Sequence, residues 1–151
     1  MGFAIGFLQH GPVQTELVAG EQSERGRIVI EEFVEYFTSP MGYWMEADYR
    51  HQWREAIGRT VAGAARSCLM TAVYDPERAN FMTWWPMYRE RGVVYIQNHL
   101  LFLDQLTAPL DLRRPCQSVP ARRTETDDGM PVSEWATAIE HLESWLRGEG
   151  T

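Results

Sequence analysis

The middle of the chain restricts the fold most tightly, because apolar stretches of strand length follow one another across short polar turns. The stretches are Ser67–Tyr74, Asn80–Tyr88 and Val93–Asn98, and Leu100–Leu103 continues or restarts the last of them. Their β-branched and aromatic residues are typical of strands. Strands joined by connections this short pair in antiparallel orientation. The sequence therefore predicts an antiparallel sheet, with Pro86 at an edge or a bulge because proline donates no ladder hydrogen bond.

A helical period precedes this sheet. Apolar residues recur there at the spacing that brings them onto one face of a helix, namely Tyr49, Trp53, Ala56, Ile57 and Thr60. Glu46 and Asp48 lie in the first turn, where the helix dipole favours carboxylates, and Gly63 is suited to end the helix. The pattern predicts one long internal helix over residues 46–61.

The outer segments have less regular patterns. Ile28–Phe37 fits a helical face as well as a strand; the strand is favoured, with Glu31-Glu32 as a bulge that restores alternation. The apolar residues of Val132–Leu146 predict a C-terminal helix. As an alternative, Glu134–Ala138 forms a strand before that helix. Gly11–Gly26 is rich in Glu, Gln, Gly and Ser and is predicted to be a mobile loop.

Connecting chain is predicted for two further segments, Thr107–Pro120 and Arg122–Gly129. The first is rich in proline and the second in charged residues. A length of 151 residues without a repeat or a low-complexity linker suits one domain. The expected fold is a single α+β domain spanning residues 1–151, mainly an antiparallel sheet, with the long internal helix and a short C-terminal helix. Residues 1–26 are expected to be loosely ordered.

Composition places the chain among globular proteins, since 44% of its residues are hydrophobic and 12% are aromatic. The net charge of −7 argues against a protein that binds nucleic acid through its phosphates, which needs a basic face. No run approaches the ~18 apolar residues of a membrane span, and the short apolar stretch Met1–Leu8 is not a convincing signal peptide.

With only Cys68 and Cys116, a reducing compartment is the simpler expectation. Cys68, within an apolar strand, is expected to be a buried, unreactive thiol.

Catalytic and metal-binding motifs are missing from the sequence. The four histidines are scattered, and neither an H-E-x-x-H nor a C-x-x-C motif occurs, so no metal or cofactor is expected. There is no G-x-S-x-G elbow and no glycine-rich phosphate loop. The adjacent carboxylates of Glu31-Glu32 and Asp127-Asp128 would point to opposite faces of a strand, which does not suit an acid–base pair. No catalytic residue is predicted, and the chain is not expected to be an enzyme.

A nucleic-acid-binding alternative depends on aromatic residues in the predicted sheet. An exposed platform of four rings could stack single-stranded bases, formed by Trp84, Trp85, Tyr88 and Tyr95. Such a platform needs a basic groove, and Arg89 and Arg91 scarcely provide one. Packing in the core explains most of these rings better, so this function remains the alternative.

Charge is concentrated near the N-terminal end. Eight acidic residues against Arg25 and Arg27 give residues 16–48 a charge of −6, out of −7 for the whole chain. One acidic surface on an otherwise balanced domain is what a binder of a cationic protein needs, because opposed potentials speed encounter and penalise wrong partners.

Specific residues then resemble a known family, in order and over most of the chain. They are Ile28–Ile30, Pro40–Trp44, Asp48-Tyr49, Trp53, Tyr74–Glu77, Asn80-Phe81, Tyr88, Val94–Asn98, Phe102-Leu103, Asp128–Met130 and Ser133–Trp135. The chain in these stretches is similar to the immunity proteins of bacterial contact-dependent growth inhibition systems. It departs from them in lacking Lys and in its Arg113-Arg114 and Arg122-Arg123 pairs.

The resemblance implies a small, soluble inhibitor in the bacterial cytoplasm, which binds the C-terminal toxin domain delivered by a neighbouring cell. Toxins of these systems are commonly nucleases. It also implies a Whirly-like, mainly antiparallel fold with a strand at Glu134–Ala138, a monomer or weak dimer, and no membrane or nucleic-acid partner. Seven matched aromatic residues are then expected in the core, namely Tyr43, Trp44, Tyr49, Trp53, Phe81, Phe102 and Trp135. Acidic side chains are expected to contact the toxin, and the candidates are Glu21, Glu24, Glu31, Glu32, Glu35, Asp127 and Asp128.

Overall fold

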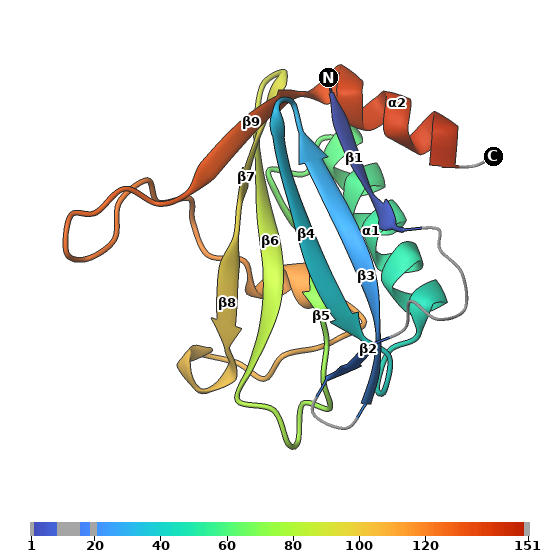
Figure 1. Ribbon diagram of the computed structural model, residues 1–151. Helices are drawn as coiled ribbons and strands as arrows, with labels where there is room; N and C mark the ends of the chain where they lie inside the picture. The colour runs from blue at the N-terminus through green and yellow to red at the C-terminus, as the bar shows by residue number, and fades with distance from the viewer. Residues whose placement is uncertain (1, 9–15, 19–20, 150–151) are drawn as a thin grey trace.

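The computed structural model describes residues 2–8, 16–18 and 21–149 (Figure 1). In this part of the chain, four strands precede the first helix and five strands lie between the two helices. The strands are β1 (Phe3–Phe7), β2 (Glu16–Val18), β3 (Glu21–Ile30), β4 (Phe33–Pro40), β5 (Arg66–Ala72), β6 (Phe81–Glu90), β7 (Val93–Gln97), β8 (His99–Phe102) and β9 (Glu134–Ala138). The helices are α1 (Glu46–Val61) and α2 (Ile139–Glu149). Short 3-10 turns at Leu103–Gln105 and Pro115–Ser118 interrupt the connecting chain. The predicted α+β class is confirmed, as are the strand at Glu134–Ala138 and the helix after it.

Two antiparallel sheets form the domain. In the first sheet, β3 pairs with β1 and β2 along one edge and with β4 along the other. In the second sheet the order is β5-β6-β7-β9, and β8 pairs with the beginning of β6. The first sheet crosses the upper part of the second, where the ring of Phe33 on β4 stacks on Trp135 of β9 with centroids 3.9 Å apart (Figure 1).

The single strand predicted over Ile28–Phe37 is wrong. Ile30 pairs with Phe33, so Glu31-Glu32 is the two-residue turn of a β-hairpin rather than a bulge. Glu31 has a positive φ of 56°, which such tight turns require. No turn was predicted at Glu31-Glu32, because Gly, Asn or Asp usually occupies the position with positive φ.

The mobile loop predicted over Gly11–Gly26 is also wrong where the structure describes it. Residues 16–18 form β2, and residues 21–26 belong to β3. Residues 11–15 and 19–20 lie outside the described residues. The predicted loose ordering of residues 1–26 likewise misses β1, whose apolar residues Phe3, Ile5 and Phe7 enter the core.

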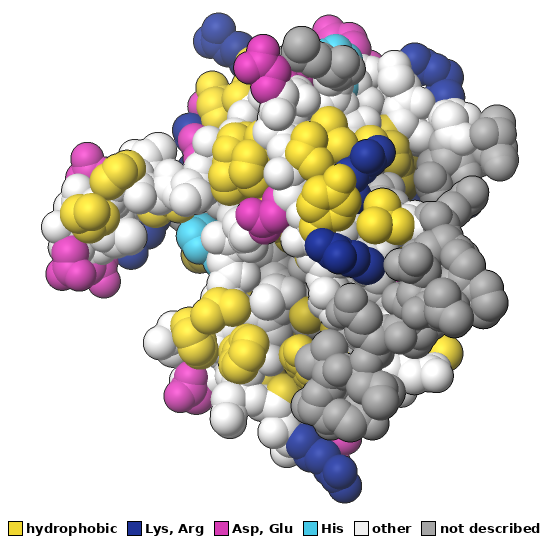
Figure 2. All heavy atoms as spheres, viewed as in Figure 1, with side chains coloured by type: hydrophobic (Ala, Val, Ile, Leu, Met, Phe, Trp, Pro, Cys, Tyr) yellow, Lys and Arg dark blue, Asp and Glu magenta, His cyan; other side chains and the backbone are white. Residues whose placement is uncertain are grey.

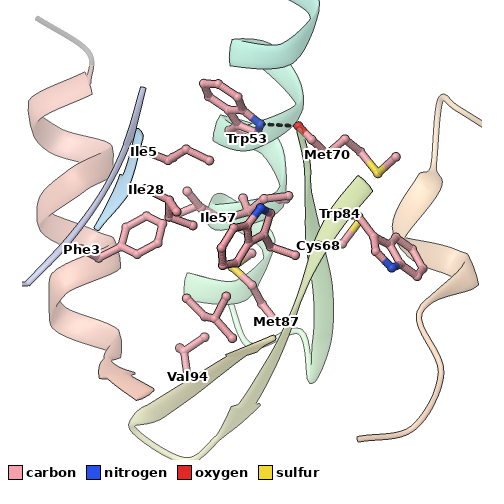
Figure 3. Close-up of a cluster of buried hydrophobic side chains, with 14 of the residues drawn as sticks. Phe3, Ile5, Ile28, Trp53, Ile57, Cys68, Met70, Trp84, Met87 and Val94 are labelled. Atoms are coloured by element: carbon pink, nitrogen blue, oxygen red, sulfur yellow. Dashed lines mark hydrogen bonds between the residues drawn. The ribbon is translucent and has the colours of Figure 1, made fainter. Parts of the chain in front are cut away.

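Helix α1 begins and ends where the sequence predicts, and its apolar stripe is buried. Its side chains also form hydrogen bonds with backbone groups along the outer edge of β5. The Trp53 Nε1–H donates to the Met70 carbonyl at 2.7 Å (Figure 3). The Gln52 side chain accepts from the Met70 N–H at 2.8 Å and donates to the Cys68 carbonyl at 2.9 Å. Because these groups replace a neighbouring strand, the helix covers an edge that would otherwise expose unpaired backbone.

Pro86 lies in the central strand of the second sheet, not at its edge. On one side of β6, the residues up to Trp84 pair with β8, and the residues from Met87 onward pair with β7. Pro86 lies between these two groups. The partner strand is interrupted between β7 and β8 at Asn98, so a residue without an N–H is accommodated there.

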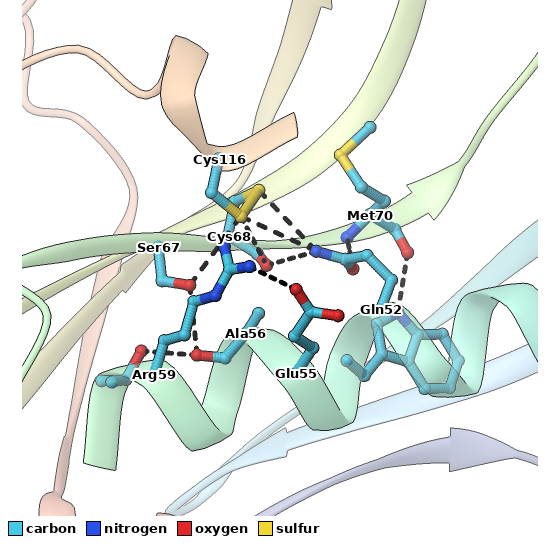
Figure 4. The surroundings of a disulfide bond; sticks show 10 residues. Gln52, Glu55, Ala56, Arg59, Ser67, Cys68, Met70 and Cys116 are labelled. Carbon is cyan, nitrogen blue, oxygen red and sulfur yellow. Dashed lines mark hydrogen bonds and ion pairs between the residues drawn. A yellow bond between two sulfur atoms is a disulfide. The ribbon is translucent and has the colours of Figure 1, made fainter. Parts of the chain in front are cut away.

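The two cysteines form a disulfide, and the expected free thiol at Cys68 is therefore wrong. The Cα atoms of Cys68 and Cys116 are 5.3 Å apart, and 48 positions separate them in the sequence (Figure 4). The bond fastens the irregular chain after β8 to strand β5. The expectation of a reducing compartment had rested on two cysteines being too few for a dense disulfide framework, and this single bond removes part of its support.

Candidate binding surface

The described residues offer little for metal chemistry. No group of three or more His, Cys, Asp or Glu side chains lies close enough to hold an ion in residues 2–8, 16–18 and 21–149. His51 contacts Glu55 on the surface of α1, and His99 donates to the Gln97 side-chain oxygen at 2.7 Å. Burial lowers the pKa of His99, which favours this neutral, hydrogen-bonded form. His10 lies outside the described residues.

The aromatic platform of the nucleic-acid alternative is not formed. Trp84, Trp85 and Tyr88 are 4%, 1% and 4% exposed. Tyr95 is covered by the guanidinium of Arg122, which lies 3.9 Å from the ring centroid. These rings pack in the core or under a cation, so they present no open stacking face.

Glu31 holds the hairpin turn against the C-terminal helix. Its carboxylate accepts from the Thr137 hydroxyl at 2.6 Å and contacts His141 Nδ1 at 2.6 Å. The hydrogen bond from Thr137, followed by the hydrogen bond and charge of His141, lowers the pKa of Glu31. The Glu31 backbone N–H also donates to the Gly2 carbonyl. These contacts give Glu31 a structural role.

Glu35 lies on β4 beside a hollow between the two sheets. Its carboxylate accepts from the Asn98 side-chain amide at 3.0 Å. The hollow has a volume of about 280 Å³ and its walls include Phe37 and Thr38 from β4, Thr83 and Trp85 from β6. Glu35 therefore lines a concave part of the surface, although its carboxylate already has a partner within the chain.

The other predicted acidic contacts are dispersed. Glu32 is exposed in the hairpin turn, whereas Glu24 lies on β3 opposite Ser39, near the other end of the hairpin. Seven residues of strand place Glu24 and Glu31 about 23 Å apart. Glu21 begins β3, and its side chain is outside the described part of the structure. The single acidic surface expected from the sequence is thus spread along a hairpin.

Asp127 and Asp128 are exposed on a long loop that projects from the side of the domain (Figure 1). Asp127 pairs with Arg123 at 2.6 Å. At the base of this loop, Arg122 contacts both carboxylate oxygens of Glu134, at 2.6 and 2.8 Å. The hydrogen bonds to Glu134 raise the pKa of Arg122, and those from Arg122 lower the pKa of Glu134. This bidentate pair anchors a loop whose acidic tip faces solvent.

Several aromatic residues predicted for the core lie on the surface instead. Tyr49 and Trp53 are buried, and Trp44 and Trp135 are partly buried. Tyr43, Phe81 and Phe102 are exposed, however, as are Val34, Tyr36 and Leu100. Figure 2 shows hydrophobic side chains gathered over β3 and β4, and others over the lower part of β6 and β8. Sequence reasoning missed these residues as candidates for binding.

The comparisons with known proteins agree with one another. A model of the CdiI N-terminal domain family matches residues 39–145. Immunity protein CdiI of Enterobacter cloacae subsp. cloacae is 33% identical over 135 residues, which cover 88% of this chain and 89% of that protein. A chain of the CdiA-CT/CdiI toxin and immunity complex from Enterobacter cloacae superposes with a TM-score of 0.86 and 27% identity, covering 98% of both chains.

The fold and these matches define a small immunity protein of the contact-dependent growth inhibition type, as the resemblance in the sequence had implied. The chain belongs to the CdiI immunity protein family. No helix in the described part of the chain has the length and apolar character needed to cross a membrane.

Proposed function

We propose that this protein binds the C-terminal toxin domain of its cognate contact-dependent growth inhibition effector and neutralises it. The observation that carries the proposal is the agreement over 98% of the chain with a member of a toxin and immunity complex. The toxin is proposed to be a basic nuclease, and the chain is proposed to act by binding alone, without a reaction or cofactor of its own. An inhibitor of a lethal enzyme needs a Kd near nanomolar, or about −12 kcal/mol.

We place this action in the cytoplasm, where a nuclease would meet its substrate, with the chain as a monomer or weak dimer that binds neither membrane nor nucleic acid. Cytoplasmic thiols are kept reduced. The Cys68–Cys116 disulfide is then expected to be reduced inside the cell and to form once the protein is oxidised. Alkylation of the two thiols in freshly lysed cells, followed by mass spectrometry, measures this; a full disulfide in that sample would contradict the assignment.

The dispersed acidic residues are proposed to steer the encounter with the toxin. Of the seven candidates, Glu21, Glu24, Glu31, Glu32, Glu35, Asp127 and Asp128, we expect Glu32 and Asp128 to act most directly, because both are exposed. Charges at the rim of an interface change mainly the association rate. Glu31 and Glu35 hold contacts within the chain, so their contribution comes through their charge and not through new hydrogen bonds.

Protection of growing cells is the direct test. The toxin domain encoded beside this gene is produced from an inducible promoter, with or without this protein. Protection is expected only when both are present, and growth arrest in the presence of the protein would overturn the proposal. For the steering residues, Glu32→Lys with Asp128→Lys should slow association several-fold at low salt and weaken its salt dependence. The control is Glu140→Lys, at an exposed residue on α2, for which a change within about twofold is expected.

A further inference from the structure

Building on the proposed function, we infer that the toxin docks on an apolar step where the first sheet stops covering the second. The apolar step is defined by Phe81, Leu100 and Phe102, together with the hollow beside Glu35. Those three residues are 40%, 51% and 40% exposed. The partner surface that fits it is a ridge of apolar or aromatic side chains on the toxin, flanked by carboxylates.

The step follows from how the two sheets cross. Strand β4 lies over the upper part of the second sheet, where Phe33 stacks on Trp135 and Asn98 donates to Glu35. Beyond the β4 edge, none of the described elements covers the same face of β6 and β8, and Figure 2 shows hydrophobic side chains there. Phe81 and Phe102 are cross-strand partners on this face.

The strands place the exposed residues on the outer face before any partner arrives. Their neighbours in the strands, Met82 and Leu101, are buried at 0% and 4% exposed, so alternation forces Phe81, Leu100 and Phe102 outward. The rings of Phe81 and Phe102 have centroids 6.3 Å apart. A preorganised apolar surface loses little side-chain entropy on binding, which favours high affinity.

The charges beside the step indicate what should surround the apolar ridge. On the outward face of β3, Arg25 lies opposite Thr38, which is part of the wall of the hollow, and Arg27 lies opposite Tyr36. The Arg25 guanidinium is 5.3 Å from the Tyr36 ring centroid. Tyrosine, phenylalanine and arginine around an apolar centre are the residues enriched where interfaces concentrate their binding energy. These two cations call for carboxylates at the matching place on the toxin, within a surface that is basic as a whole.

Dissociation kinetics test the inference on purified full-length protein and an inactivated form of the toxin domain encoded beside its gene. Phe102→Ala and Leu100→Ala should each raise the dissociation rate, by about tenfold or more for at least one of them, because truncating a central apolar anchor weakens the bound state. Val93→Ala is the matched control: Val93 is 37% exposed and lies at the opposite end of the second sheet, so its dissociation rate should stay within about twofold. Melting temperatures establish that all variants fold.

The outcomes separate the two proposals. Wild-type binding with unchanged dissociation of both step variants overturns the apolar step and leaves the proposed function standing. No binding by the wild type overturns both. A change confined to self-association in analytical ultracentrifugation would assign the step to a second copy of the chain and contradict the inference. Arg25→Glu should raise the dissociation rate if carboxylates of the toxin face this edge, and an unchanged or lower dissociation rate would contradict the chemistry proposed for the partner.

Discussion

Gln52 joins α1 to the edge of β5, and replacing it with Leu should destabilise the protein markedly. Leu keeps most of the apolar volume but leaves the Met70 N–H and the Cys68 carbonyl without their side-chain partners. Each buried group left unsatisfied costs about 1–3 kcal/mol. Gln52 is 8% exposed, beside a groove, so water reaches it partly and we expect a total loss of about 2–4 kcal/mol.

Urea unfolding of Gln52→Leu measures this loss, with an unchanged dependence on denaturant as the sign that the unfolded state is unaffected. In a chain of this length the melting temperature should fall by about 5–12 °C. The control is Gln105→Leu, because Gln105 is exposed and its replacement should change stability by less than about 0.5 kcal/mol. A loss below about 0.5 kcal/mol for Gln52→Leu would refute the view that helix side chains satisfy the β5 edge.

Three further changes probe other parts of the domain. Cys116→Ser should cost about 4 kcal/mol in oxidising buffer, from closing a loop of 48 positions, and its urea midpoint should not respond to a reductant, unlike that of the wild type. Gly26→Ala should destabilise by about 1–3 kcal/mol, because its Cβ would lie 2.3 Å from the Phe37 ring; equal stability in thermal unfolding would contradict this packing. Glu31 has a lowered pKa in the folded state, so its contribution to stability is present above its ordinary pKa and is lost as the pH falls through the folded value. The stability difference between the wild type and Glu31→Gln should therefore shrink between about pH 6 and pH 3, and a constant difference would argue against the contact with Thr137 and His141.

Helix α1 was predictable because its signals are local. An apolar stripe from Tyr49 to Thr60, acids in the first turn and Gly63 after the end all act within one segment. The hairpin around Glu31-Glu32 was missed because two glutamates are not typical of a tight turn. The partners of Glu31, Thr137 and His141, are also more than 100 positions away in the sequence. The Cys68–Cys116 bond depends in the same way on where the chain after β8 returns.

The exposed aromatic residues show a different limit of sequence reasoning. Alternation along β6 and β8 places Phe81 and Phe102 on the face opposite Met82 and Leu101, but it does not say which face another layer covers. That depends on how far β4 extends over the second sheet, which is a tertiary property. Aromatic residues were therefore assigned to the core by their chemistry, and the ones that the first sheet fails to cover became surface.

Charge density along the sequence misleads for a related reason. Acidic residues that are close in the sequence lie about 3.3 Å apart per position once the segment forms a hairpin. Two of them also have partners within the chain: Glu31 contacts Thr137 and His141, and Glu35 contacts Asn98. A dispersed field of this kind attracts a cationic partner over distance but gives little contact energy, since exposed ion pairs contribute only about 0–1 kcal/mol each. The affinity of about −12 kcal/mol that the proposed function requires then has to come from buried apolar anchors. Among the described residues, the apolar step supplies three such anchors on a rigid sheet, so mutations there should govern how long the complex lasts, and mutations of Glu32 and Asp128 how fast it forms.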